Sequence, residues 1–193
     1  MPSEKILLIG VNHKTTPVEI REKIALSEGY EKPLAALKDI KGLREYYLLS
    51  TCNRVELLVV TDAGSNVLDD LIYFLFGDTV PRNSCEEYLY IMYNKEAVHH
   101  LFMVAASLDS MVVGEAQILG QLKEAYRHAA RFGCTGPLLN KLIHKSFSVA
   151  KRVRTETAIG SSAVSISYAA VQLAKKIFGN LEEKKVLLVG AGE

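Results

Sequence analysis

Residues 50–56, with the sequence STCNRVE, combine residue types suited to covalent acyl chemistry. Cysteine is intrinsically nucleophilic, and a cation such as Arg54 two positions after Cys52 favours the thiolate. Arginine also suits a substrate that carries a carboxylate, because its planar fork can bind both oxygens. The structural alternative is a small buried cysteine beside a surface arginine in a hairpin. This segment alone leaves both interpretations open.

Two short apolar runs flank this segment. Residues 46–49 (YYLL) precede it and residues 57–60 (LLVV) follow it. Both runs are rich in strand-forming residues and are too short for ordinary helices, so we predict two β-strands. The polar segment would then lie at a strand junction, where a rigid scaffold can hold the thiol, amide and guanidinium close together.

The remaining elements up to residue 93 follow from periodicity and from turn residues. The spacing predicts a strand over 5–11, a helix over 30–41, a helix over 67–76 and a strand over 87–93. Together with the two central strands, the order is β-α-β-β-α-β. That order predicts an α+β fold with a ferredoxin-like unit, whose helices cover one face of an antiparallel sheet.

After residue 93 the hydrophobic period becomes helical. Amphipathic helices are expected over the following four ranges: 95–108, 118–132, 138–155 and 161–178. We therefore predict three parts: residues 1–93 as the ferredoxin-like catalytic part, 94–157 as a helical part, and 158–193 as the first helix and strand of a Rossmann-type domain.

The last eight residues, VLLVGAGE, predict a buried strand over 186–189 that runs into a Gly-x-Gly turn. A dinucleotide-binding βαβ unit begins in this way, because glycines let a pyrophosphate approach the next helix. A lone Gly-x-Gly can also be a plain turn. A parallel-type strand without a partner is an unstable way to end a fold, so we expect this chain to be a piece of a longer one.

Composition excludes several classes of function. The 193 residues include 23 basic and 22 acidic side chains, and the net charge of +1 gives no overall field that attracts nucleic acid. The three cysteines lack CxxC or Cys/His metal spacing, so we expect free thiols, a reducing cytoplasmic location and no metal site. No apolar run approaches the roughly 20 residues of a membrane-spanning helix, and the N-terminus lacks the apolar core of a signal peptide.

Among the five histidines, His100 alone lies near other candidate chemistry. It begins the stretch 100–110, most of which lies in the helix predicted over 95–108, and further polar residues follow at Ser110, Glu115 and Gln117. A histidine could act as general acid or base for Cys52. The alternative is a partly buried, hydrogen-bonded helix histidine, and only one of His99 and His100 can face a cleft.

The predicted helix over 138–155 carries a polar stripe of Lys141, Lys145, Ser148 and Arg152. Such a stripe is usually a solvated face, but it could also contact RNA phosphates. An RRM-like use of the sheet is disfavoured, because the strands lack the aromatic stacking pattern of that module.

Four separated motifs in one order resemble the glutamyl-tRNA reductase family. They are GVNHKTTP at 10–17, STCNRVE at 50–56, the stretch 100–121, and KSFSVAKRVRTET at 145–157, with GAGE at 190–193. The resemblance implies NADPH-dependent reduction of glutamyl-tRNA to glutamate-1-semialdehyde through a cysteine thioester, the first step of five-carbon tetrapyrrole biosynthesis.

The resemblance also implies roles for individual residues. Cys52 matches the family nucleophile and His100 the histidine important for activity. Ala116 stands where many members have proline. The cofactor positions are Gly190, Ala191, Gly192 and Glu193. The substrate-contact positions are Thr51, Asn53, Arg54, Ser110, Glu115, Ala116, Gln117 and Gln121.

The implied partners are glutamyl-tRNA, a second copy bound through a C-terminal domain that this chain lacks, and glutamate-1-semialdehyde aminomutase for product transfer. We expect this chain to accept the glutamyl group but not to reduce it. The alternatives are a non-catalytic tRNA-binding module with an inert Cys52, and a nicotinamide-dependent dehydrogenase of another substrate class.

Overall fold

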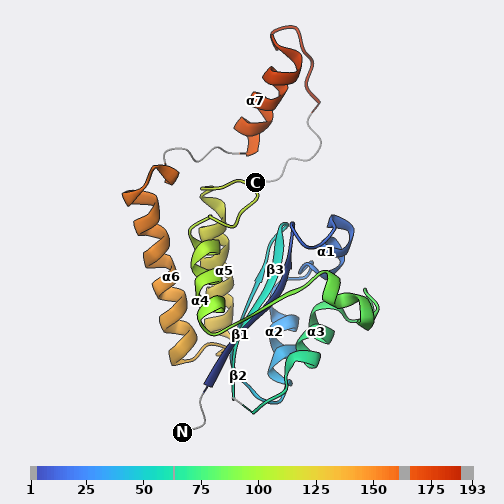
Figure 1. Cartoon of the computed structure of the whole chain (residues 1–193), viewed down its shortest axis with the longest axis vertical. Coiled ribbons are helices and arrows are strands. Elements are labelled where there is room, and N and C mark those ends of the chain that lie inside the picture. The colour runs from blue at the N-terminus through green and yellow to red at the C-terminus, as the bar shows by residue number, and fades with distance from the viewer. Residues whose placement is uncertain (1–3, 63, 161–165, 188–193) are drawn as a thin grey trace.

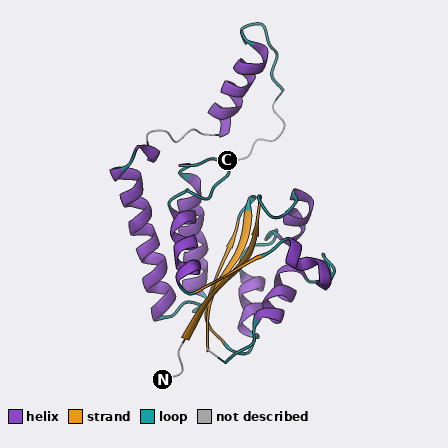
Figure 2. Ribbon diagram, viewed as in Figure 1, coloured by secondary structure: helices purple, strands orange, loops and turns teal. Residues whose placement is uncertain are grey.

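A four-stranded antiparallel sheet lies between two layers of helices (Figures 1 and 2). The structure is a computed structural model that describes residues 4–62, 64–160 and 166–187. The strand order is β2-β3-β1-β4, and every neighbouring pair is antiparallel. The strands are β1 (Glu4–Asn12), β2 (Leu43–Ser50), β3 (Arg54–Asp62) and β4 (Tyr90–Tyr93).

The first three helices cover one face of the sheet and the next three cover the other (Figure 1). The first layer contains α1 (Val18–Ile24), α2 (Glu31–Lys38) and α3 (Leu68–Phe76). The second layer contains α4 (Lys95–Ala105), α5 (Gln117–Arg131) and α6 (Pro137–Glu156). Two short 3₁₀ helices, η1 (Arg82–Glu87) and η2 (Ala158–Gly160), and the helix α7 (Ile166–Phe178) complete the described elements.

Two adjacent tyrosines on β2 show how both faces are buried. Successive strand side chains point to opposite faces. The Tyr46 hydroxyl donates to the Leu34 carbonyl of α2 at 3.2 Å, and the Tyr47 hydroxyl donates to the Leu122 carbonyl of α5 at 3.1 Å. One buried apolar cluster extends through both layers, so it crosses the predicted boundary at residue 93.

A buried carboxylate joins β2 to the start of α6. The Glu45 side chain accepts hydrogen bonds from the backbone N–H groups of Leu138 (3.1 Å) and Leu139 (2.6 Å). These donors have no partner inside the helix, and a negative charge suits the positive end of the helix dipole. A Cβ atom at Gly136 would lie 2.7 Å from the Glu45 carboxylate oxygen, so a side chain there would force the carboxylate to move.

The structure confirms a mixed α/β architecture with an antiparallel sheet, and it changes several predicted boundaries. Helix α1, which has only seven residues and follows Pro17, was not predicted from the sequence. The strand predicted over 87–93 was too long, because residues 82–87 form η1 and only residues 90–93 pair with β1. The helix predicted to reach residue 108 ends at Ala105.

The C-terminal segment differs from the two-layer part in its exposure. Large apolar side chains of α7 are exposed, among them Leu173, Ile177 and Phe178. Residues 186 and 187, where a strand was expected, are in no strand, and residues 188–193 lie outside the described residues. In the part of the chain that the structure describes, no helix is both long and apolar enough to span a bilayer.

Candidate active site

Cys52 lies in the short loop that joins β2 to β3. The Thr51 N–H donates to the Arg54 carbonyl at 2.8 Å, and the Thr51 hydroxyl accepts from the Arg54 N–H at 3.1 Å. The neighbouring segment also ties the loop down, because the His13 N–H donates to the Asn53 carbonyl at 3.0 Å and Arg21 donates to the Cys52 carbonyl. The backbone of the loop is therefore fixed from two sides, while the Cys52 side chain stays free.

The exposures of Cys52 and Arg54 are the reverse of the structural alternative, which placed a buried cysteine beside a surface arginine. Cys52 is exposed, whereas the other cysteines, Cys85 and Cys134, are buried. Arg54 is only 2% exposed. An accessible thiol can meet a substrate, and a buried arginine must find its partners inside the protein.

Arg54 belongs to a polar cluster with the buried residues Glu56 and His100 and the half-buried residues Tyr90 and Asp109. Arg54 Nη1 donates to Glu56 Oε1 at 2.5 Å, and Nη2 donates to the carboxylate of Asp109 at 3.1 Å and to its carbonyl. The same Glu56 oxygen accepts from the Tyr90 hydroxyl and lies 2.8 Å from His100 Nε2. A carboxylate can only accept, so Nε2 carries the proton and only Nδ1 of His100 is left for another partner.

Strand register explains why this cluster fits within the sheet. Glu56 of β3 is opposite Gly10 of β1, and Gly10 is opposite Tyr90 of β4. A Cβ atom on Gly10 would lie 2.7 Å from the Val55 carbonyl oxygen and 2.8 Å from Glu56 Cγ. Glycine therefore leaves the space in which the Glu56 carboxylate and the Tyr90 hydroxyl meet.

The cluster strongly perturbs its own ionisation. Burial raises the pKa of Glu56, but Arg54 and the hydrogen bond from His100 outweigh burial and lower that pKa to about 2. Burial and the Glu56 charge together raise the pKa of Tyr90 far above its usual value. At neutral pH the centre of the cluster is thus an ionised carboxylate held by a neutral tyrosine, a histidine and an arginine.

One small pocket, of about 30 Å³, brings most of the predicted site residues together. Its lining comes from the Cys52 loop, from the segment after α4 and from the first turns of α5. Gln117 and Gln121 stand one helical turn apart on α5. The lining residues are Thr51, Cys52, Asn53, Arg54, Ser110, Met111, Glu115, Gln117, Ile118 and Gln121. Ala116, at the N-cap of α5, is not among them.

His100 lines a different pocket, of about 630 Å³, together with His99, Met92, Met103 and Asp109. His100 is buried toward the sheet and His99 is exposed, so His100 is the member of the pair that faces the interior. Through Glu56 and Arg54, His100 is connected to the Cys52 pocket without lining it.

A bent segment between α4 and α5 carries Asp109, Ser110 and Glu115. Ser107 is buried and has a positive φ of 61°, an uncommon backbone conformation for a residue other than glycine. The Gly114 N–H donates to the Ser107 carbonyl at 2.9 Å, and Arg154 of α6 donates to the carbonyls of Gly114 and Glu115. Helix α6 therefore positions one wall of the Cys52 pocket.

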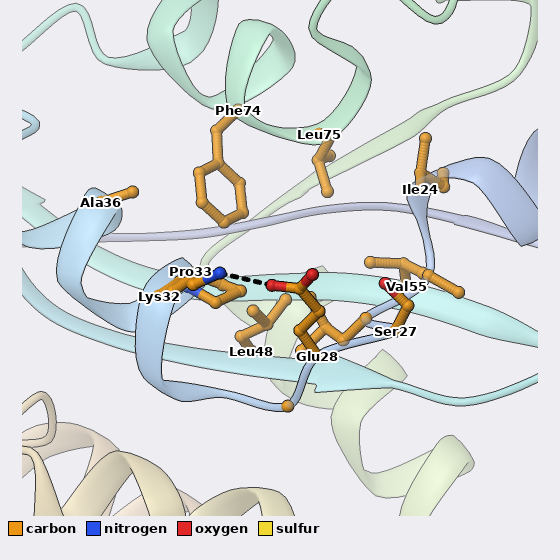
Figure 3. A pocket seen from close by; sticks show the side chains of 13 residues that line it. Ile24, Ser27, Glu28, Lys32, Pro33, Ala36, Leu48, Val55, Phe74 and Leu75 are labelled. Carbon is orange, nitrogen blue, oxygen red and sulfur yellow. Dashed lines mark hydrogen bonds and ion pairs between the residues drawn. The ribbon is translucent and has the colours of Figure 1, made fainter.

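A further pocket, of about 380 Å³, lies on the opposite face of the sheet and contains none of the predicted site residues. Figure 3 shows its mostly apolar walls, with Phe74 and Leu75 of α3 above Leu48 and Val55 of the sheet, and an ion pair between Lys32 and Glu28.

The polar stripe on α6 is exposed at all four positions, Lys141, Lys145, Ser148 and Arg152, and Arg152 pairs with Glu156 on the same helix. Among the described residues, no group of three or more His, Cys, Asp or Glu side chains has a metal-binding arrangement.

Comparison with known proteins agrees with the motifs that line the Cys52 pocket. A family model described as "Glutamyl-tRNAGlu reductase, N-terminal domain" matches residues 9–157. The chain belongs to the glutamyl-tRNA reductase family. Glutamyl-tRNA reductase of Desulfotalea psychrophila is 67% identical over 193 residues, which are 100% of this chain and 45% of the relative. The enzyme of Geobacter sulfurreducens is 55% identical over 191 residues, covering 97% of this chain and 44% of the relative.

A solved structure of a family member has a similar fold. Glutamyl-tRNA reductase from Methanopyrus kandleri matches with a TM-score of 0.68 and 37% identity, over 97% of this chain and 44% of that one. This chain thus spans less than half the length of the relatives to which it is similar.

Four residues of the site had no role predicted from the sequence: Gly10, Glu56, Tyr90 and Asp109. One available signal was the i, i+2 spacing of Arg54 and Glu56 on a strand, which places both side chains on one face. Tyr90 and Gly10 depend on strand register, which the sequence did not reveal. Gly190, Ala191, Gly192 and Glu193 lie outside the described residues.

Proposed function

We propose that this chain is the acyl-accepting part of a glutamyl-tRNA reductase, in which Cys52 takes the glutamyl group from glutamyl-tRNA as a thioester. One observation carries the proposal: the exposed thiol of Cys52 lies in one pocket with seven of the eight substrate-contact positions implied by the family. The ferredoxin-like description of residues 1–93, supported by the strand order β2-β3-β1-β4, and the division into parts 1–93, 94–157 and 158–193 belong to the same proposal.

The transfer begins with attack of the Cys52 thiolate on the carbonyl carbon of the aminoacyl ester. A C–S bond forms, the ester C–O bond breaks, and the 3′ oxygen of the tRNA leaves and takes up a proton. Thr51 shapes the loop so that Cys52 projects from it, and the polar groups of Ser110, Gln117 and Gln121 are available to orient the substrate. Covalent catalysis of this kind splits one hard reduction into two easier steps.

In the whole enzyme NADPH would supply the hydride that reduces the thioester. The residues expected to hold it, Gly190 to Glu193, are outside the residues that the structure describes. A homodimer, an aminomutase partner that receives the product and a reducing cytoplasmic location are further parts of the proposal.

Two residues keep specific roles within this proposal. Arg54 would select glutamate by binding its γ-carboxylate, since a neutral amide leaves a guanidinium poorly paired. For that, Arg54 must exchange one of its present carboxylate partners, because both of its arms are engaged. His100 would act on the reaction through its contact with Glu56, or directly once the two pockets connect.

Intact-mass measurement after mixing the protein with glutamyl-tRNA tests the proposal. We expect a glutamyl adduct that disappears in Cys52→Ser and persists in Cys85→Ser, the matched control at a buried thiol. An adduct that survives Cys52→Ser would overturn the assignment. Binding of tRNA that ignores the aminoacyl group, with no adduct, would instead support a non-catalytic tRNA-binding module.

A further inference from the structure

The part of Arg54 that a substrate carboxylate would need is already occupied by a carboxylate of the protein. Nη1 of Arg54 is committed to Glu56, which is buried. Nη2 donates both to the side chain and to the carbonyl of Asp109. Charge-assisted contacts of this kind are the strong ones, so a ligand carboxylate that binds Nη2 must compete with Asp109 for it.

Asp109 has a second partner that would keep it paired after displacement. Its Oδ1 atom accepts from Lys14 Nζ, while its Oδ2 atom faces Arg54. The Lys14 side chain is 56% exposed and that of Asp109 17% exposed, so this pair lies nearer to solvent than Arg54 does. Burial raises the pKa of Asp109, but hydrogen bonds from Lys14 and Arg54 outweigh it, so the group is an ionised competitor for Arg54.

The Arg54–Asp109 contact also lies between the two pockets of this side of the sheet. Arg54 lines the small pocket that contains Cys52, and Asp109 lines the larger pocket that contains His100. The small pocket holds about 30 Å³, room for water but not for an amino-acid side chain. Ser110 and Met111, which follow Asp109 directly, form part of its wall.

We propose that Asp109 is an internal carboxylate that occupies Arg54 until the γ-carboxylate of a glutamyl group replaces it, which makes Asp109 a determinant of substrate selectivity. The inference rests on the proposed function and deepens it. Once displaced, Asp109 remains on Lys14, the wall at residues 110–111 moves with it, and the spaces around Cys52 and His100 join. A neutral side chain such as that of glutamine cannot replace a charged competitor, so the exchange rejects it.

Glutarate, a five-carbon dicarboxylate, provides a probe that needs neither tRNA nor cofactor. One of its carboxylates stands for the γ-carboxylate and the other for the acyl end beside Cys52. We expect glutarate to protect Cys52 from alkylation by iodoacetamide, as read by peptide mapping, and we expect its uncharged diamide, glutaramide, to give no protection.

Two variants should shift the protecting concentration of glutarate in opposite directions. Asp109→Asn removes the charged competitor, so half-protection should need about tenfold less glutarate. Lys14→Met removes the partner to which the displaced Asp109 would remain bound. Half-protection should then need on the order of threefold more glutarate, because the pair is largely exposed. If Asp109 only braced the loop, both variants would weaken protection.

Shifts in the same direction, or no shift, would overturn the inference. If Asp109→Asn does not fold, two measurements still test the inference: the surface variant Lys14→Met, and the comparison of glutarate with glutaramide in the unaltered chain. Equal protection by glutarate and glutaramide would overturn the inference. Opposite shifts without a glutamyl adduct from glutamyl-tRNA would count against the proposed function alone.

Discussion

Cys52 and Arg54 are two residues apart, yet they lie in opposite environments. Cys52 projects into solvent from a loop held by backbone contacts, and its thiol has no close polar partner among the described hydrogen bonds. Arg54 is buried, and both of its arms bind carboxylates that reach it from β3 and from the segment after α4. The reacting group is therefore accessible and structurally dispensable, whereas the selecting group is part of the folded interior.

This difference makes the two positions separable by experiment. Changes to the Cys52 side chain should alter the chemistry and leave the stability unchanged. Changes in the cluster should alter the stability first, because buried charges depend on one another.

The largest effect is expected for Glu56→Gln. The change leaves Arg54 buried with one charged partner instead of two, and removing one member of a buried ion pair costs about 3–5 kcal/mol. The free energy of unfolding, measured in urea, should fall by that amount. A loss below about 1 kcal/mol would mean that the cluster is solvated in solution and that the comparison with Cys52 fails.

The stability of the protein at low pH should depend on the same cluster. The pKa of Glu56 is about 2 in the folded protein against 4.5 for the free group, so its contribution to stability is complete above about pH 4.5 and is lost as the pH falls toward 2. The contribution is about 3 kcal/mol. Urea titrations at several pH values should show this slope in the unaltered chain and a weaker slope in Glu56→Gln. Equal slopes in the two proteins would mean that groups other than Glu56 cause the acid sensitivity.

Gly10→Ala should have an intermediate effect. The added methyl group would meet the Val55 carbonyl and Glu56 Cγ at under 3 Å, and overpacking of this kind costs about 1–3 kcal/mol. Gly120→Ala is the matched control, because no atom lies within 4 Å of the added carbon and glycine disfavours the helix by about 1 kcal/mol. The control should therefore become slightly more stable, and parallel losses in both variants would contradict the packing argument.

The smallest effect on stability is expected for Cys52→Ala. The side chain is exposed, so the free energy of unfolding should stay within about 0.5 kcal/mol, while the glutamyl adduct is lost entirely. A larger loss of stability would show that the thiol supports the fold and would weaken the contrast with Arg54.

The sequence predicted the Cys52 loop better than it predicted the cluster, for a physical reason. The loop is local: two apolar runs flank a polar segment, and β2 and β3 form the hairpin that this pattern indicates. The cluster is non-local, because Tyr90 and His100 meet Glu56 only through strand pairing and helix packing. The hydrophobic periodicity of a segment predicts whether it forms a helix or a strand, but not which other element it packs against.

The same limit explains the errors in the fold. Every residue of β3 from Arg54 to Thr61 is buried, so the strand shows no polar alternation that would reveal a second helical layer. The strand expected over 87–93 began too early because Tyr88 instead hydrogen-bonds back to Cys85 at the end of η1. Helix α1 is too short for a helical period to stand out.

The contact between Glu45 and the start of α6 has a consequence for how relatives can diverge. The carboxylate satisfies two backbone donors and fills the space that any side chain at position 136 would need. Neither position can change alone without leaving a steric clash or an unpaired donor. Among homologues, positions 45 and 136 should therefore change together, so the join between the helical layer and the sheet constrains both positions as a pair.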